Sequence, residues 1–126
     1  MQGLETHTSF QPQGCDFTID GTAATVGPGS QLANLYEELG KIGQIIVGGN
    51  SKSVSVGGYL TGGGHSILAP RYGLGADQIL EMEVVTPAGD IVLANECQNQ
   101  DLFWAMRGVS NATADFMKHA NLYCLT

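Results

Sequence analysis

The stretch ILEMEVVTPAGDIVLAN, residues 79–95, holds two runs of strand-forming residues around a turn signal. Valine and isoleucine favour β-strands, in which successive side chains point to opposite faces. Pro, Gly and Asp in PAGD, residues 87–90, are typical of a tight turn. The pattern therefore predicts an antiparallel hairpin with strands over 79–86 and 91–94.

A strand, a helix and a second strand are predicted upstream of this hairpin. AATVGPG, residues 23–29, is a short apolar run stopped by Gly and Pro, which indicates a strand end and a turn. In SQLANLYEELGKIG, apolar residues recur at spacings of three and four, which predicts a helix over 30–42 with Ser30 as N-cap and Gly43 as stop. QIIV, residues 44–47, predicts a short buried strand. The apolar face of the helix is expected to comprise Leu32, Leu35, Tyr36, Leu39 and Ile42.

Downstream of the hairpin, NQDLFWAMRG predicts a short helix with Asn99 or Asp101 near its start and Gly108 at its end. Its two aromatic residues, Phe103 and Trp104, are expected in the core. The order of all these elements, with a parallel-type crossover and a hairpin, predicts an α+β or mixed α/β fold in which helices pack on a sheet.

The final residues, VSNATADFMKHANLYCLT, have weak periodicity and few turn signals. The pattern suggests only a short helix over TADFMKHANLY, residues 113–123.

Composition narrows the functional classes. The 126 residues suit one domain or one piece of a larger domain, with 43% hydrophobic residues and only 13% charged ones. The net charge is −7 and no basic cluster exists, which argues against nucleic-acid binding. No apolar run reaches the roughly 18 residues of a membrane span. The start, MQGLETHTSF, has no signal-peptide pattern, so the compartment is not determined.

The cysteines and histidines do not form a recognisable site. Cys15, Cys97 and Cys124 are odd in number and far apart, so they are expected to be three unrelated thiols rather than a disulfide framework. The three histidines are scattered without matching acidic residues, so no metal site is expected.

Glycine is concentrated in GGNSKSVSVGGYLTGGGHSILAPRYGLGADQ, residues 48–78, between apolar residues. Glycine permits positive φ and close approach of a ligand, and successive backbone N–H groups can form an anion-binding nest. This stretch is therefore either a cradle for the diphosphate of a dinucleotide or a set of tight turns without a ligand. Its glycine spacing fits neither an ordinary Rossmann fingerprint nor a P-loop.

Three stretches carry a resemblance to a known family: ATVGPGSQLANLYEEL, VGGYLTGGGHSILAPRYGLGADQILEMEVVTPAGDIV and ANECQNQDLFWAMRG. They resemble the PCMH-type FAD-binding domain of the vanillyl-alcohol oxidase family, and within it the fungal berberine-bridge-enzyme-like oxidases. The resemblance covers most of residues 20–108. We therefore expect a partial FAD-binding domain over 1–108 and a divergent tail over 109–126.

This resemblance implies a two-subdomain flavin domain, with FAD as cofactor and a small molecule as substrate. The reaction it implies is hydride transfer from an alcohol- or amine-type substrate to the flavin, which dioxygen reoxidises. Members of the family are often secreted. The resemblance assigns neither the substrate nor a catalytic residue to this chain.

The resemblance also implies which residues meet FAD. The glycine loop is expected along the diphosphate and the isoalloxazine edge, with Leu74 and Asp77 in the next flavin-side segment and the backbone of Val84 and Val85 near the adenine end. His65 is expected to pack beside the flavin, with a role as general base as the alternative. The full expected set is Gly57, Gly58, Gly62, Gly63, Gly64, His65, Ser66, Leu74, Asp77, Val84 and Val85.

The sequence departs from the family pattern at three places. It lacks the R-S-G-G-H loop through which many members attach the flavin. Ser51 stands where some members carry a second attachment cysteine, and a hydroxyl does not replace a thiolate in that chemistry. After Gly108, VSNATADF replaces the family's glycine run. These departures raise the alternative of a truncated, inactive remnant with weak or no FAD binding.

Overall fold

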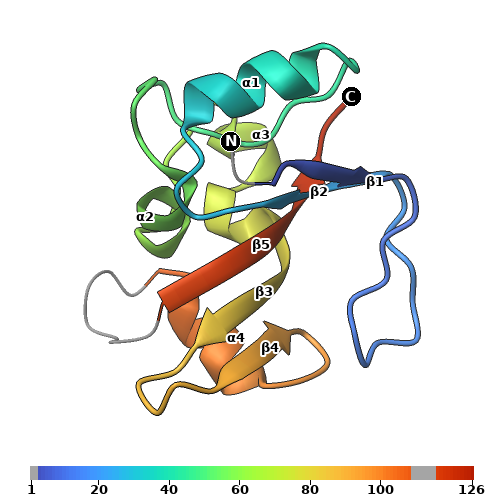
Figure 1. Ribbon diagram of the computed structural model, residues 1–126. Helices are drawn as coiled ribbons and strands as arrows, with labels where there is room; N and C mark the ends of the chain where they lie inside the picture. The colour runs from blue at the N-terminus through green and yellow to red at the C-terminus, as the bar shows by residue number, and fades with distance from the viewer. Residues whose placement is uncertain (1–2, 109–115) are drawn as a thin grey trace.

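The structure, a computed structural model, describes residues 3–108 and 116–126. It contains one five-stranded sheet and several short helices (Figure 1). The elements in chain order are β1 (Glu5–His7), β2 (Thr22–Val26), α1 (Leu32–Gly40), α2 (Val56–Thr61), α3 (Ala69–Tyr72), the 3-10 helix η1 (Gly75–Gln78), β3 (Ile79–Val85), β4 (Ile91–Asn95), α4 (Gln100–Met106) and β5 (Phe116–Cys124). The predicted mixed α/β fold, a sheet with packed helices, is confirmed.

The strand order in the sheet is β1-β2-β5-β3-β4, and every neighbouring pair is antiparallel. Because β2 and β3 both run antiparallel to β5, they run parallel to each other, and the segment from α1 to η1 crosses between them. The expected crossover therefore exists, but its second strand is β3. The strand predicted over 44–47 is wrong, because this segment makes only one bridge, between Ile45 and Leu125, which lies beyond the end of β5.

The predicted hairpin is confirmed as β3 and β4, with Val84 opposite Val92. Its turn is closed by two backbone hydrogen bonds between Thr86 and the residues of the turn: the Thr86 amide donates to the Asp90 carbonyl, and the Gly89 amide donates to the Thr86 carbonyl, each at 2.8 Å. The predicted helix after the hairpin is confirmed as α4, with Asn99 as its N-cap.

The helix predicted over 30–42 is present but shorter. Its N-cap is Gln31 rather than Ser30, and its last residue is Gly40. Leu32, Leu35 and Leu39 are fully buried, as the spacing predicts, but Ile42 lies beyond the helix and is 54% exposed. Periodicity therefore identified the buried face and overestimated its length at the C-terminal end.

The C-terminal residues form the central strand of the sheet, β5, rather than the short helix suggested by the pattern (Figure 1). Ala120, Leu122 and Cys124 point into the core, while the residues between them point to the other face. A register shift against β3 between Glu83 and Val84 interrupts this alternation, which explains why the sequence pattern was weak. Residues 113–115 of the suggested helix lie outside the described residues. That the family pattern ends at residue 108 stays a prediction.

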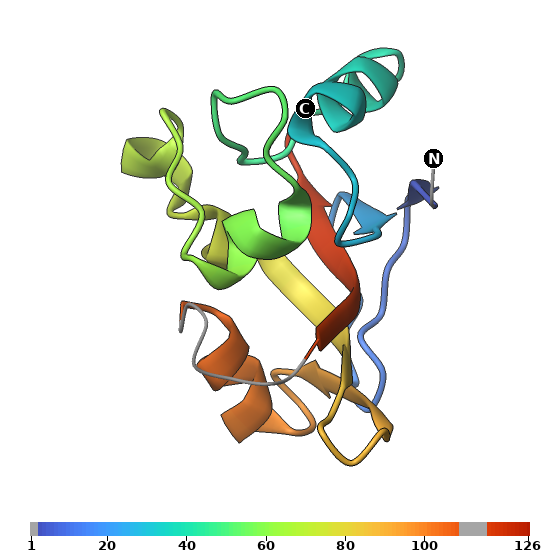
Figure 2. The same cartoon turned by 60° about the vertical axis from the view of Figure 1, so that its left-hand side comes forward.

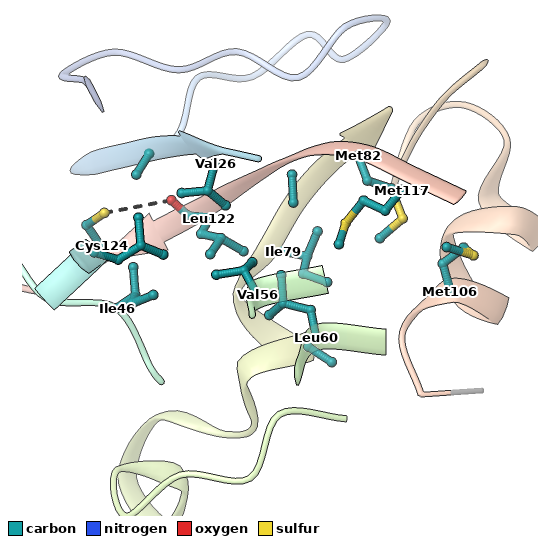
Figure 3. Close-up of a cluster of buried hydrophobic side chains, with 14 of the residues drawn as sticks. Val26, Ile46, Val56, Leu60, Ile79, Met82, Met106, Met117, Leu122 and Cys124 are labelled. Atoms are coloured by element: carbon teal, nitrogen blue, oxygen red, sulfur yellow. Dashed lines mark hydrogen bonds between the residues drawn. The ribbon is translucent and has the colours of Figure 1, made fainter. Parts of the chain in front are cut away.

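The core lies between the sheet and the helices, which pack on one face of it (Figure 2). Helix α2 inserts Val56 and Leu60 toward Ile79, and the sulfur-containing side chains of Met82, Met106 and Met117 gather at one end (Figure 3). Cys124 packs as an apolar residue at the other end of the core, beside Ile46 (Figure 3), and burial raises the pKa of its thiol to about 11.

The opposite face of the sheet carries a row of polar side chains, one from each strand. In the order of the strands these are His7, Thr25, Asn121, Glu81 and Asn95. Each member is hydrogen bonded to the next one in the row. At one end His7 Nε2 lies 2.8 Å from Thr25 Oγ1, and at the other end Asn95 Nδ2 donates to Glu81 Oε2 at 2.9 Å. Hydrogen bonding compensates for the burial of Glu81 and Asn95, which are 7% and 0% exposed.

A disulfide joins Cys15 to Cys97, so the expectation of three unrelated thiols is wrong. The two residues are 82 positions apart in sequence, yet their Cα atoms lie 5.4 Å apart. The fold brings them together because the Gln13 backbone is bound at both of its polar groups: its N–H donates to Glu81 Oε2 at 2.7 Å, and its carbonyl accepts from Asn95 Nδ2 at 2.9 Å. Spacing in the sequence could not reveal this tertiary contact.

Candidate cofactor-binding site

Helix α2 and the glycine turn that follows it line a hollow of about 270 Å³. Four of the expected site residues meet there, together with the loop that contains Ser51. The lining residues are Leu32, Gly49, Asn50, Ser51, Val54, Gly58, Tyr59, Gly62, Gly64 and His65.

The first glycine pair lies in the first half of α2, and its two members meet different surroundings. A Cβ at Gly57 would lie 2.9 Å from the Pro28 side chain, and the Gly57 amide donates to the Pro28 carbonyl at 2.9 Å. A Cβ at Gly58 would have no atom within 4 Å. Gly57 is therefore required by packing within the chain, whereas Gly58 leaves open space at the hollow.

The second group of glycines forms a turn with positive φ at Gly63 (105°) and Gly64 (76°). A Cβ at Gly64 would lie 2.8 Å from the Cα of Gly75. Two backbone hydrogen bonds tie the turn to that segment: Gly75 N–H to the Gly64 carbonyl at 2.8 Å, and Ala76 N–H to the Gly63 carbonyl at 3.2 Å. The close approach of these two segments thus explains why position 64 is a glycine, without any ligand. At Gly63, by contrast, a Cβ would meet nothing within 4 Å.

We expect Gly64→Ala to lower the free energy of unfolding by about 2–4 kcal/mol, because the new methyl group adds a clash with Gly75 to the strain of positive φ. Urea unfolding of the two proteins measures this difference. Gly29→Ala is the matched control, since a Cβ there would meet nothing within 4 Å. An unchanged unfolding midpoint for Gly64→Ala would show that the two segments do not pack as described.

Three successive amides follow this turn, those of Gly64, His65 and Ser66. None of them donates a hydrogen bond to any residue that the structure describes. Ser66 is 3% exposed, and its Oγ accepts a hydrogen bond from the Leu68 amide at 3.1 Å. Consecutive free N–H groups beside a positive-φ glycine are the arrangement that binds anions in a nest.

Four expected site residues from later segments, Leu74, Asp77, Val84 and Val85, do not line this hollow. Leu74 is 40% exposed, and its amide donates to Asp77 Oδ2 at 2.8 Å. Asp77 lines a second hollow of about 360 Å³ together with Trp104, Arg107 and Gly108. The cofactor contacts expected for Leu74 and Asp77 stay predictions.

Val84 and Val85 belong to β3, which pairs with β4 on one side and β5 on the other. Val84 is fully buried in the core. Their expected place near the adenine end of FAD also stays a prediction.

Of the two aromatic residues of α4, one is where it was expected and one is not. Phe103 is buried in the core, but Trp104 is 73% exposed, because successive residues of a helix face different directions. Sequence reasoning also missed Tyr59, which lies between the two glycine groups and lines the hollow. An aromatic residue flanked by glycines on both sides was the available signal.

Within residues 3–108 and 116–126, no group of three or more His, Cys, Asp or Glu residues is placed to hold a metal ion. Over the same ranges, each helix is too short or too polar to cross a membrane. The hollow itself is lined by glycine backbone and by apolar and uncharged polar side chains. His65 contributes its only imidazole.

Comparison with known proteins identifies this antiparallel sheet with helices on one face as part of a flavin-binding domain. Residues 12–95 match the family described as FAD binding domain, and the chain belongs to this family. The expected cofactor, FAD, and the resemblance to VAO-type and berberine-bridge-enzyme-like flavoproteins are confirmed.

Among curated relatives, the FAD-linked oxidoreductase easE of Arthroderma benhamiae is 40% identical over 124 residues, which are 97% of this chain and 25% of the relative. Aurantioclavine synthase cnsA of Penicillium expansum is 47% identical over 109 residues, 85% of this chain and 23% of the relative. The chain thus spans about a quarter of the length of these relatives.

Solved structures give the same result for the fold. The VAO-type flavoprotein MtVAO615 of Myceliophthora thermophila superposes with a TM-score of 0.86 at 34% identity, covering 97% of this chain and 22% of that one. BBE-like 1 of Physcomitrella patens superposes with a TM-score of 0.77 at 32% identity, covering 82% and 22%.

Proposed function

We propose that this chain is the FAD-holding part of an FAD-linked oxidoreductase, which moves a hydride from an alcohol- or amine-type small molecule to the flavin, with dioxygen as the final acceptor. The observation that carries the proposal is the hollow itself, where an open glycine face at Gly58 lies beside the unpaired amides that follow Gly63. The relatives named FAD-linked oxidoreductases favour this function over that of an inactive remnant.

The residues at the hollow suit the diphosphate of FAD. The amides of Gly64, His65 and Ser66 supply donors for its oxygen atoms, and the missing side chain at Gly58 lets it approach the α2 backbone. His65 is exposed and lines the hollow, which supports the proposed place of its side chain beside the flavin. When bound, FAD supplies the hydride acceptor.

The proposal also includes the FAD contacts expected for residues that do not line the hollow. We propose that Leu74 and Asp77, in the segment after the glycine turn, contact the flavin side of FAD and that the backbone of Val84 and Val85 runs near its adenine end. We assign no catalytic residue, since the hollow presents no pair of groups arranged for proton transfer.

The proposal is tested by mixing the purified chain with FAD, removing free flavin by gel filtration and recording the flavin absorbance that stays with the protein. We expect close to one flavin per chain. Protein that elutes without flavin at saturating FAD would contradict the proposal.

We expect this flavin to be bound without a covalent bond. Ser51 lines the hollow at the position where some relatives of this family carry an attachment cysteine, and its hydroxyl does not form such an adduct. Acid precipitation of the loaded protein should therefore leave all flavin fluorescence in the supernatant. A fluorescent pellet that persists after washing would overturn this expectation.

A further inference from the structure

Tyr59, on α2, gathers three backbone carbonyl groups around its hydroxyl. The oxygen atoms of Gly64, Val47 and His65 lie 3.0, 3.1 and 3.2 Å from it. A phenol has one proton to donate, so these carbonyls share a single donor. Burial raises the pKa of Tyr59 to about 12, so the hydroxyl keeps this proton at neutral pH.

The ring of Tyr59 fixes the position of that hydroxyl. A Cβ at Gly75 would lie 2.6 Å from Tyr59 Cε1, and a Cβ at Gly49 would lie 3.2 Å from Cε2. The glycines on both sides of the ring thus make room for it. Gly75 in turn donates its N–H to the Gly64 carbonyl, so ring, hydroxyl and glycine turn form one packed unit.

The carbonyl contacts decide where the neighbouring amides point. In a trans peptide unit the C=O and the following N–H point in opposite directions. Because the Gly64 and His65 carbonyls face the Tyr59 hydroxyl, the N–H groups of His65 and Ser66 face away from it. These are two of the three amides that have no hydrogen-bond partner among the described residues.

We propose that Tyr59 is a positioning residue for cofactor binding: its hydroxyl holds the Gly64 and His65 carbonyls so that the His65 and Ser66 amides face the FAD diphosphate. This inference rests on the proposed function of the hollow. Tyr59 acts through these amides and not by chemistry of its own. A second half-buried tyrosine, Tyr36, donates its hydroxyl to the Gly49 carbonyl at 2.6 Å rather than to a carbonyl of the glycine turn.

Tyr59→Phe tests the inference, because it removes the hydroxyl and keeps the ring between Gly49 and Gly75. We expect the dissociation constant for FAD, measured on the purified chain by quenching of flavin fluorescence, to rise about tenfold, the factor that corresponds to one lost hydrogen bond. Tyr123→Phe is the matched control. Tyr123 lies in β5, and its side chain packs against Gly21 on the face of the sheet opposite the core. We expect the Tyr123→Phe chain to bind FAD as tightly as the unchanged chain.

Amide hydrogen exchange supplies a second readout that general destabilisation would not produce. In the unchanged chain FAD should slow exchange at His65 and Ser66, and in Tyr59→Phe this protection should be lost while exchange in β3 and β5 stays the same. Equal FAD affinity and equal protection in the two proteins would overturn the proposed role of Tyr59 and leave the proposed function of the hollow unaffected. If the unchanged chain takes up no FAD, the proposed function fails and this inference fails with it.

Discussion

Gly58→Val abolishes FAD binding while the chain stays folded: this is the result that we expect from the open face of α2. Outside the backbone of its own helix, a Cβ at position 58 would have no atom within 4 Å, so we expect the valine side chain to occupy the hollow. Valine is also at least as good a helix former as glycine, so the helix is not weakened. We expect the affinity for FAD to fall by a factor of about 100 or more, equivalent to about 2.7 kcal/mol.

Gly40→Val is the matched control for this experiment. Gly40 is the last residue of α1, has no atom within 4 Å of its added Cβ and does not line the hollow. Both variants should keep the circular dichroism and thermal midpoint of the unchanged chain, and only Gly58→Val should lose FAD. Full affinity in Gly58→Val would place the cofactor elsewhere. Position 63 is a poorer choice, because its φ of 105° would strain any side chain independently of a ligand.

Loss of the disulfide should have the largest effect on stability. The bond between Cys15 and Cys97 closes a loop of 82 residues, and removing such a loop constraint costs about 4 kcal/mol in the chain-entropy account. We expect Cys15→Ser/Cys97→Ser to unfold at much lower urea concentration than the oxidised chain. The lower stability follows from a less restricted unfolded state, so the sheet itself should keep its structure.

A reductant separates this effect from damage by the new side chains. Added dithiothreitol should lower the unfolding midpoint of the unchanged chain to nearly that of the double variant and leave the double variant unaffected. If the unchanged chain has the same midpoint with and without the reductant, the disulfide does not stabilise the fold.

Local signals in the sequence were sufficient for the hairpin and for two of the helices. PAGD between two β-rich runs identified β3 and β4, and leucine spacing identified the buried face of α1. Residues 44–47 show the limit of such reasoning, because an apolar run forms a strand only where a neighbouring strand is available to pair with it. That segment forms a strand-type bridge with a single residue, Leu125, and its Ile46 and Val47 are buried without a ladder of such bridges.

Long-range contacts explain the features that the sequence did not reveal. The bulged register of β5 against β3 hid its alternation, and the contact between Cys15 and Cys97 depends on the Gln13 backbone held by Glu81 and Asn95. The glycines of residues 48–78 fall into two groups. Packing within the chain explains Gly57 and Gly64, whereas open space at Gly58 leaves room for the proposed ligand.

The most direct test of the proposed cofactor site is an experimental structure of the chain with FAD bound. We predict that diphosphate oxygen atoms accept hydrogen bonds from the His65 and Ser66 amides, at N–O distances of about 3 Å, above the open face of Gly58. A diphosphate bound elsewhere on the chain, with these two amides facing water, would contradict the proposed site.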